Sequence, residues 1–86
     1  MKQPNIAVYG LRNCSETSRA LRFLDTHQVA YEFKDLDESP ELNQYLADLN
    51  NGKRVTPTIQ IDNAVLINPS DQELDAAIQQ ATAQRA

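Results

Sequence analysis

Cysteine is scarce in this sequence. Cys14 is the only cysteine among 86 residues, and His27 is the only histidine. One cysteine excludes an intramolecular disulfide, and these two side chains cannot complete a four-ligand zinc site within one chain. Any redox chemistry therefore has to pass through a mixed disulfide between Cys14 and another molecule.

Long apolar runs and a surplus of basic residues are also missing. No apolar segment approaches the ~20 residues needed to span a bilayer. Twelve acidic residues against eight basic ones give a net charge of −4, which argues against nucleic acid or a membrane as the main partner. Residues 1–5 lack the basic and apolar regions of a signal peptide. An unpaired cysteine suits a reducing compartment, so we expect a cytoplasmic protein.

The length predicts a single domain that covers residues 1–86. With 41% hydrophobic residues the chain can form one modest core. Packing alone has to stabilise this core, because there is no disulfide or metal to reinforce it. We expect a monomer.

The first half of the sequence alternates between strand and helix patterns. Residues 6–9 form a short apolar run that predicts a buried strand. Apolar residues at helical spacing predict a helix over residues 15–27, with Asn13 and Glu16 as a capping pair at its start. Residues 29–33 alternate between apolar and polar side chains and predict a second strand.

A second helix is predicted after this strand. Ser39 and Pro40 suit the N-cap and the first position of a helix. Leu42, Leu46 and Leu49 would form its buried stripe.

The remaining sequence predicts a hairpin and a last helix. Two apolar runs, residues 58–61 and 64–67, are joined by two polar residues, which is typical of a compact hairpin. Ser70 and Glu73 have the spacing of a capping box ahead of the last helix. A βαβ unit makes the first two strands parallel, and the hairpin adds two antiparallel strands. The sequence therefore predicts an α/β fold of order βαβαββα, a four-stranded mixed sheet flanked by three helices.

Cys14 lies where the first strand ends and the first helix begins. The positive end of a helix dipole stabilises a thiolate, which is the nucleophile in disulfide exchange. Arg12 and Arg19 add positive charge nearby, whereas Glu16 in the first turn repels a thiolate. We therefore expect a reactive thiol, and the alternative is an inert, buried cysteine. Thr17 is either an ordinary first-turn residue or a hydroxyl that donates a hydrogen bond to the Cys14 sulfur.

A resemblance to a known family supports the reactive thiol. The element order, with Cys14 after the first strand and Val55-Thr56-Pro57 before the third, resembles the glutaredoxins of the thioredoxin fold. The resemblance extends over roughly residues 6–78. Segments 50–54 and 68–70 most resemble the mycoredoxin-like and other small bacterial glutaredoxin-like proteins. The resemblance implies a thioredoxin-like fold in which Pro57 is cis and faces Cys14.

The resemblance also implies how a small thiol would be held. The backbone of Thr56 would pair with the cysteinyl part of glutathione. Ser70 and Asp71 would hold the γ-glutamyl carboxylate at the start of the last helix. Lys53 and Arg54 would bind the glycine carboxylate if they face Cys14; otherwise they are solvated loop charges.

The sequence departs from the family in several positions around Cys14. Thr17 replaces the second cysteine of the usual C-x-x-C pattern. Leu11 stands where many glutaredoxins carry a lysine, so Arg12 would supply that charge from the next position. Because Glu16 opposes the thiolate, we expect the pKa of Cys14 to be lowered less than in a typical glutaredoxin.

These observations predict a monothiol glutaredoxin-like thiol–disulfide oxidoreductase. Cys14 would accept a small thiol from a protein mixed disulfide, and a second small thiol would regenerate it. No bound cofactor is expected; glutathione, mycothiol or bacillithiol would be the co-substrate, and thiolated proteins the partners. One alternative is a non-catalytic adaptor that only binds. Others are a 2Fe–2S carrier, although the Cys-Gly-Phe-Ser signature is absent, and an arsenate-reductase-like protein, which residues 9–14 also resemble.

Overall fold

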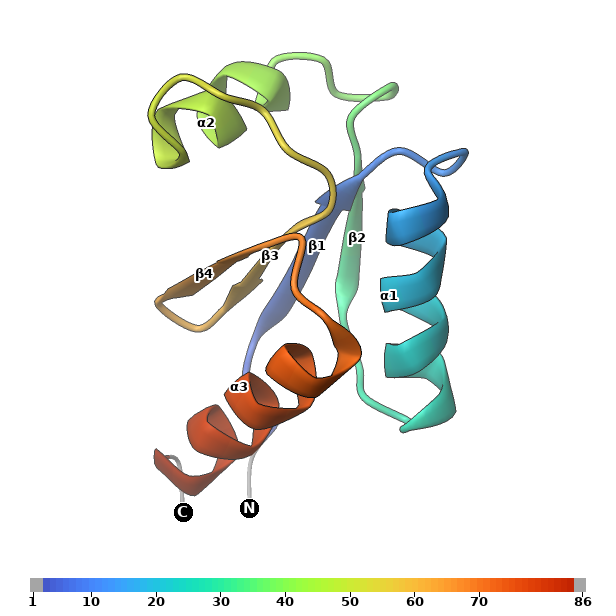
Figure 1. The fold of residues 1–86 in the computed structure, drawn as a ribbon, viewed down its shortest axis with the longest axis vertical. Coiled ribbons are helices and arrows are strands. Elements are labelled where there is room, and N and C mark those ends of the chain that lie inside the picture. The colour runs from blue at the N-terminus through green and yellow to red at the C-terminus, as the bar shows by residue number, and fades with distance from the viewer. Residues whose placement is uncertain (1–2, 85–86) are drawn as a thin grey trace.

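The computed structural model describes residues 3–84 of the chain. The elements follow the predicted order βαβαββα. They are β1 (Ile6–Gly10), α1 (Ser15–Thr26), β2 (Glu32–Asp35), α2 (Leu42–Leu49), β3 (Thr58–Ile61), β4 (Ala64–Ile67) and α3 (Asp71–Gln84). Figure 1 shows that the loop after β1 and the loop before β3 lie at the same end of the sheet.

The four strands form one mixed sheet in the order β2-β1-β3-β4. β1 pairs with β2 in parallel and with β3 antiparallel, and β3 pairs antiparallel with β4. Val8, at the centre of β1, lies opposite Phe33 on one side and Ile59 on the other. The predicted mixed sheet and the predicted hairpin are confirmed.

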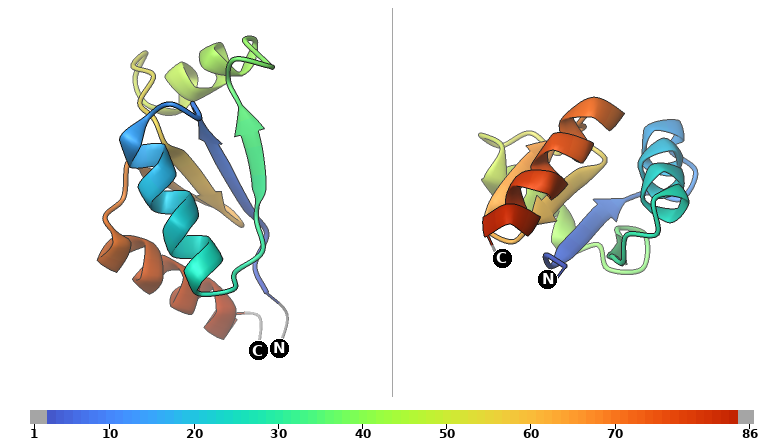
Figure 2. Two further views of the ribbon diagram at one scale, coloured as in Figure 1. Left: turned by 90° about the vertical axis from the view of Figure 1, so that its right-hand side faces the viewer. Right: turned by 90° about the horizontal axis from the view of Figure 1, so that it is seen from below.

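Successive side chains of a strand point to opposite faces of the sheet. The hydrophobic clusters on the two faces differ in size. Val8 and Ile59 belong to the larger cluster, together with Leu24 of α1 and Leu74 of α3. Tyr9 belongs to a smaller cluster that includes Leu46 of α2 and Leu36. Thus α1 and α3 cover one face and α2 covers part of the other, and Figure 2 shows the three helices around the sheet.

The second strand begins later than the alternating pattern predicted. The structure has β2 at Glu32–Asp35, whereas residues 29–33 were expected. Gln28 adopts a positive φ of 56°, and the N–H of Val29 donates to the carbonyl of Leu24 at 2.9 Å. Because this turn uses the Val29 N–H to close the end of α1, the strand cannot begin there.

The second helix is shorter and less buried than predicted. It begins at Leu42 with Glu41 as its N-cap, because a tight turn precedes it in which Leu42 N–H donates to the Ser39 carbonyl at 3.0 Å. The expected N-cap role of Ser39 is therefore wrong. Leu46 is buried as predicted, but Leu49 is 37% exposed and is not a core residue.

The capping box of the last helix is confirmed. The Ser70 N–H donates to Oε1 of Glu73 at 2.8 Å, and the Glu73 N–H donates to Oγ of Ser70 at 3.1 Å. These bonds also lower the pKa of the Glu73 carboxyl group, so it is ionised at neutral pH. Within the described residues, no helix is long and apolar enough to cross a membrane.

Candidate active site

Cys14 lies at the carboxyl end of the central parallel strand, where open α/β sheets place their ligands. It is the N-cap of α1, with an extended backbone at φ −88° and ψ 124°. Its N–H donates to the Leu11 carbonyl at 3.0 Å, and its own carbonyl accepts from Ser18 N–H at 3.0 Å. The side chain is partly exposed, which the inert, buried alternative does not allow.

The predicted capping role of Asn13 is wrong. Because Cys14 itself occupies the N-cap, no side chain caps the first turn of α1. The Glu16 carboxylate pairs instead with Nε of Arg19 at 2.8 Å, one turn along the same helix. The first N–H groups of α1 are therefore left free to face the Cys14 sulfur.

These N–H groups help to lower the pKa of Cys14 to about 7. The largest cause is the backbone N–H of Thr17, followed by the hydroxyl of Thr56, the hydroxyl of Thr17 and the backbone N–H of Glu16, while partial burial acts in the opposite direction. A thiol with this pKa is about half ionised at neutral pH. The expectation that Glu16 limits the shift relative to other glutaredoxins stays a prediction.

Thr56 contributes a hydroxyl that sequence analysis missed. Its Oγ1 lies 3.6 Å from Cys14 Sγ and donates a hydrogen bond to the sulfur, across 42 positions in the sequence. The peptide bond between Thr56 and Pro57 is cis, as the resemblance implied, and Pro57 is buried. The sequence offered only the backbone of Thr56 as a ligand group, because no local pattern reveals which way its side chain points.

Thr17 is completely buried beside Gly10. Within the described residues its Oγ1 has no hydrogen-bond partner of acceptable geometry. A Cβ atom added at Gly10 would lie only 2.6 Å from this Oγ1, so Gly10 is required for the packing. The hydroxyl lowers the pKa of Cys14 through its proximity, but it does not complete the predicted hydrogen bond in this arrangement.

The start of α3 lies beside the proline loop. The N–H of Asn68 donates to the Pro57 carbonyl at 2.8 Å, which brings the capping box of α3 close to Thr56 and Pro57. Arg19 joins α1 to this segment: its Nη1 pairs with Asp71 at 2.5 Å, and its Nη2 donates to the Pro69 carbonyl at 2.8 Å. Sequence analysis named Arg19 only as a nearby charge, although the spacing of Glu16 and Arg19 could have indicated their pairing.

A groove of about 530 Å³ lies between α1 and α3. Its lining includes Ser70 and Asp71, as the resemblance led us to expect for a carboxylate site. The capping box uses the N–H groups of Ser70 and Glu73, which leaves those of Asp71 and Gln72 in the first turn of α3 for a ligand.

The remaining predicted binding residues face other parts of the protein or solvent. Arg12 lies 3.5 Å from an oxygen of Asp35 and 4.7 Å from the centre of the Phe33 ring, both on β2. Arg54 donates to Oδ1 of Asn43 on α2 at 3.0 Å. Lys53 is exposed in the same loop. The structure thus brings Thr17 and Thr56 to Cys14, with Pro57 next to Thr56 in the chain. Arg12 and Arg54 pair with other residues, and Lys53 is exposed.

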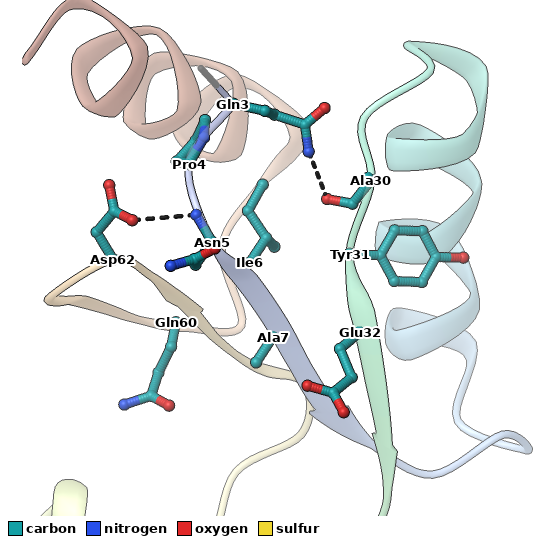
Figure 3. Close-up of a pocket in the computed structure, with 10 residues that line it drawn as sticks. All are labelled: Gln3, Pro4, Asn5, Ile6, Ala7, Ala30, Tyr31, Glu32, Gln60 and Asp62. Carbon is teal, nitrogen blue, oxygen red and sulfur yellow. Dashed lines mark hydrogen bonds between the residues drawn. The ribbon is translucent and has the colours of Figure 1, made fainter. Parts of the chain in front are cut away.

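A second hollow, of about 490 Å³, lies at the opposite end of β1 and is shown in Figure 3. Half of its ten lining residues carry amide or carboxylate side chains, and none of them is a cysteine. The residues are Gln3, Pro4, Asn5, Ile6, Ala7, Ala30, Tyr31, Glu32, Gln60 and Asp62. Across residues 3–84, no three side chains of the metal-binding types are close enough together to hold a metal ion.

The fold is similar to those of solved glutaredoxins. A glutaredoxin from Archaeoglobus fulgidus matches with a TM-score of 0.73 and 20% identity, over 88% of this chain and 87% of that chain. A buckwheat glutaredoxin in complex with glutathione matches with a TM-score of 0.76 and 16% identity, over 94% and 78%. The thioredoxin-like protein BC3987 matches with a TM-score of 0.70 and 27% identity, over 90% and 99%. The expected thioredoxin-like, glutaredoxin-type fold is confirmed.

Sequence comparison gives the family directly. No curated protein matches the chain significantly. The family model described as glutaredoxin matches residues 6–66, which is well over half of the chain. The chain therefore belongs to the glutaredoxin family.

Proposed function

We propose that the chain is a monothiol oxidoreductase that removes a low-molecular-weight thiol from protein mixed disulfides through Cys14. Thiol–disulfide exchange is the general chemistry of the glutaredoxin family. The observation that carries the proposal is a partly exposed thiol at a helix N-terminus, with a pKa of about 7 and a threonine hydroxyl 3.6 Å from the sulfur. Such a thiol is ionised and accessible under conditions where an ordinary cysteine is not.

The proposed reaction has two exchange steps. The Cys14 thiolate attacks the small thiol's sulfur in a protein mixed disulfide, a new disulfide forms on Cys14, and the protein leaves as a thiolate that takes up a proton. A second small thiol, as its thiolate, then attacks the small thiol's sulfur in that adduct. This step releases the oxidised small-thiol disulfide and regenerates Cys14. No second cysteine of this chain takes part, because the chain has only one.

Glutathione is the small thiol that the family favours, and mycothiol or bacillithiol would pass through the same two steps. In the proposed complex the Thr56 backbone pairs with the cysteinyl part of the small thiol. The free N–H groups at the start of α3, beside Ser70 and Asp71, receive its γ-glutamyl carboxylate. Lys53 and Arg54 lie in an exposed loop next to Thr56 and would attract the glycine carboxylate.

The hydroxyls of Thr56 and Thr17 would stabilise negative charge on the Cys14 sulfur. Thr56 already donates to Sγ. Thr17 holds an unused donor in a fully buried position beside it. A buried hydroxyl without a partner is costly, and a fully charged Cys14 sulfur would offset part of that cost.

Turnover of a glutathionylated peptide, with glutathione and glutathione reductase, tests the proposal. The wild-type chain should deglutathionylate the peptide, and Cys14→Ser should lower the rate to that of the reaction without protein. A circular dichroism spectrum of Cys14→Ser serves as the folding control. Equal rates for the two proteins would contradict the proposal. A Cys14 adduct that forms without turnover would instead favour the adaptor that binds a thiolated partner.

A further inference from the structure

The two edge strands of the sheet differ in their charge. β2 forms one edge and β4 forms the other, and Figure 1 shows β4 at the outer side of the hairpin. Three of the four residues of β2 are charged, namely Glu32, Lys34 and Asp35. Charged side chains keep an edge strand from pairing with another chain, whereas all four residues of β4 (Ala64–Ile67) are apolar. The edge at β4 is therefore the one suited to pairing.

The sequence around β4 is also free of charge. From Asn63 to Ser70 it contains no acidic or basic residue. A two-fold axis brings the same segment of two copies together, so any charge in the segment would oppose a like charge, which destabilises a cross-strand pair. The neutral segment avoids this cost when the neighbour is a second copy of the same chain.

The hairpin fixes which backbone groups of β4 face outward. Ile61 and Ala64 flank its two-residue turn and lie opposite each other. A two-residue turn closes with a hydrogen-bonded pair, and bonded and non-bonded positions then alternate along an antiparallel ladder. Ala64 and Leu66 therefore direct their N–H and C=O groups toward β3. The N–H and C=O groups of Val65 and Ile67 point to the open edge.

These outward groups match a second copy of β4 in one register. When Leu66 lies opposite Leu66 of the second copy, Val65 lies opposite Ile67 of the second copy, and the same pair recurs on the other side of the axis. Each pair exchanges two hydrogen bonds. This register also keeps the two faces of the sheet in line, so the side chains of Val65 and Ile67, 36% and 37% exposed, cover one another.

A third apolar side chain borders this surface. Gln60 lies opposite Val65 in the hairpin, and its Nε2 donates to Oη of Tyr45 at 2.7 Å. The Tyr45 side chain, 38% exposed, therefore lies on the same face as Val65 and next to it. Two four-residue strands with this flanking ring bury less than the about 1,200 Å² of a standard interface, so their association is expected to be weak.

We propose that β4 is the interface of a weak, two-fold symmetric dimer of this chain. The two β4 strands pair antiparallel with Leu66 on the axis, and the two sheets join into one. For an interface of this size we expect a Kd of about 100 µM, so the monomer expected from the sequence predominates in dilute solution. The inference is independent of the proposed function, because Cys14 follows β1 and β3 separates β1 from β4.

Sedimentation equilibrium of the full chain, from about 10 µM to about 1 mM, measures this Kd. Val65→Lys places an ammonium group against Ile67 of the second copy in both symmetric pairs and should raise the Kd about tenfold. The control is Ala30→Lys, which adds the same charge at an exposed position just before β2, at the opposite edge of the sheet. It should change the Kd less than about twofold. Circular dichroism checks the folding of both variants.

Disulfide cross-linking tests the register. Cys14→Ser makes the chain free of cysteine, so one new thiol can be placed in β4. In the proposed dimer the two copies of position 66 form a non-hydrogen-bonded pair about 4.5 Å apart at Cα, within the range of a disulfide. The two copies of position 65 are offset along the strands and lie beyond it. With diamide as oxidant, Cys14→Ser/Leu66→Cys should form a covalent dimer about tenfold faster than Cys14→Ser/Val65→Cys.

Three results would overturn the proposal. The first is a chain that stays monomeric up to about 1 mM. The second is an equal loss of association in Val65→Lys and Ala30→Lys, because net charge alone would then explain the effect. The third is cross-linking at position 65 that is as fast as cross-linking at position 66, because the two strands would then have no fixed register.

Discussion

The candidate site around Cys14 has two flanks that are built in different ways. On the α1–α3 flank, Arg19 ties the first turn of α1 to the start of α3 through two carboxylates and a carbonyl. On the α2 flank, Lys53 and Arg54 lie exposed in a loop, and Arg54 makes one hydrogen bond to Asn43. The first flank is acidic and already internally paired, and the second is basic and open.

The two flanks also differ in the core beneath them. The α1–α3 flank rests on the larger cluster, which contains Val8, Ile59 and Leu24. The α2 flank rests on a small cluster, and a hydrogen-bonded chain from Tyr9 through Gln60 to Tyr45 links α2 to the sheet. The comparison indicates that the first turn of α1 and the Thr56 hydroxyl set the reactivity of the sulfur, whereas the exposed basic residues of the α2 flank contribute to ligand binding. Four predictions test this division.

The largest effect is expected on stability. Leu24→Ala, in the larger cluster, should lower the free energy of unfolding by about 3 kcal/mol, because it removes a fully buried side chain and leaves a cavity. The chemically identical change Leu49→Ala, on exposed α2 surface, should cost less than about 0.5 kcal/mol. Urea unfolding measures both, and similar losses would show that α2 is packed as tightly as α1.

A smaller loss is expected from Gly10→Ala. The added Cβ would lie 2.6 Å from Oγ1 and 2.8 Å from Cγ2 of Thr17, so Thr17 would have to move. Overpacking of this kind costs about 2 kcal/mol. Combining Gly10→Ala with Thr17→Ala should recover part of the loss in the unfolding free energy relative to the sum of the two single changes. If the losses of unfolding free energy in the two single variants simply add up in the double variant, the predicted clash between the new Cβ at position 10 and Thr17 is contradicted.

Reactivity should depend on Thr56 more than on Thr17. Thr56→Val removes a donor to Sγ and raises the pKa of Cys14 from about 7, so the thiolate fraction at pH 7 falls and alkylation should slow about threefold. Thr17→Val keeps the backbone N–H, the largest cause of the lowered pKa, and should slow alkylation less. The alkylation rates of the wild type and both variants with iodoacetamide should become equal at a pH well above these pKa values, because Cys14 is then fully ionised in all three proteins. A larger effect of Thr17→Val than of Thr56→Val would mean that the hydroxyl of Thr17, and not that of Thr56, is the main side-chain donor to the Cys14 sulfur.

The smallest effect is expected on the α2 flank. Arg54→Gln should leave the alkylation rate of Cys14 unchanged and raise KM for glutathione about twofold, because an exposed charge contributes little to binding. Arg22→Gln, which removes an exposed charge from α1, is the matched control and should alter neither quantity. A slower alkylation rate in Arg54→Gln would mean that the charge of Arg54 also controls the thiolate.

Features that depend on neighbouring residues were predictable from the sequence. The hairpin strands Thr58–Ile61 and Ala64–Ile67 have the predicted bounds, because two apolar runs with a two-residue connection leave few alternatives. The capping box of Ser70 and Glu73 is equally local. The position of Cys14 at the start of α1 follows from a strand pattern that ends and a helical pattern that begins around it.

Predictions failed where two locally acceptable arrangements competed. Asn13 could cap α1, but Cys14 occupies the N-cap, and the Glu16 carboxylate forms an ion pair with Arg19. Leu49 has the spacing of a buried residue, yet α2 is short and lies over only part of the sheet, so this position stays exposed. In each case the sequence pattern describes one element and contains no information about what packs against it.

The order of the elements and the place of the single thiol at a helix start follow from the amino-acid sequence, because periodicity and capping act within a few residues. The surroundings of that thiol depend on how distant elements pack together. Thr56 reaches Cys14 across 42 positions, and Arg19 reaches Asp71 across 52. Such contacts form because β3 pairs beside β1 and α3 packs over the same face as α1. The energy of each contact depends on that packing, which no local sequence pattern encodes.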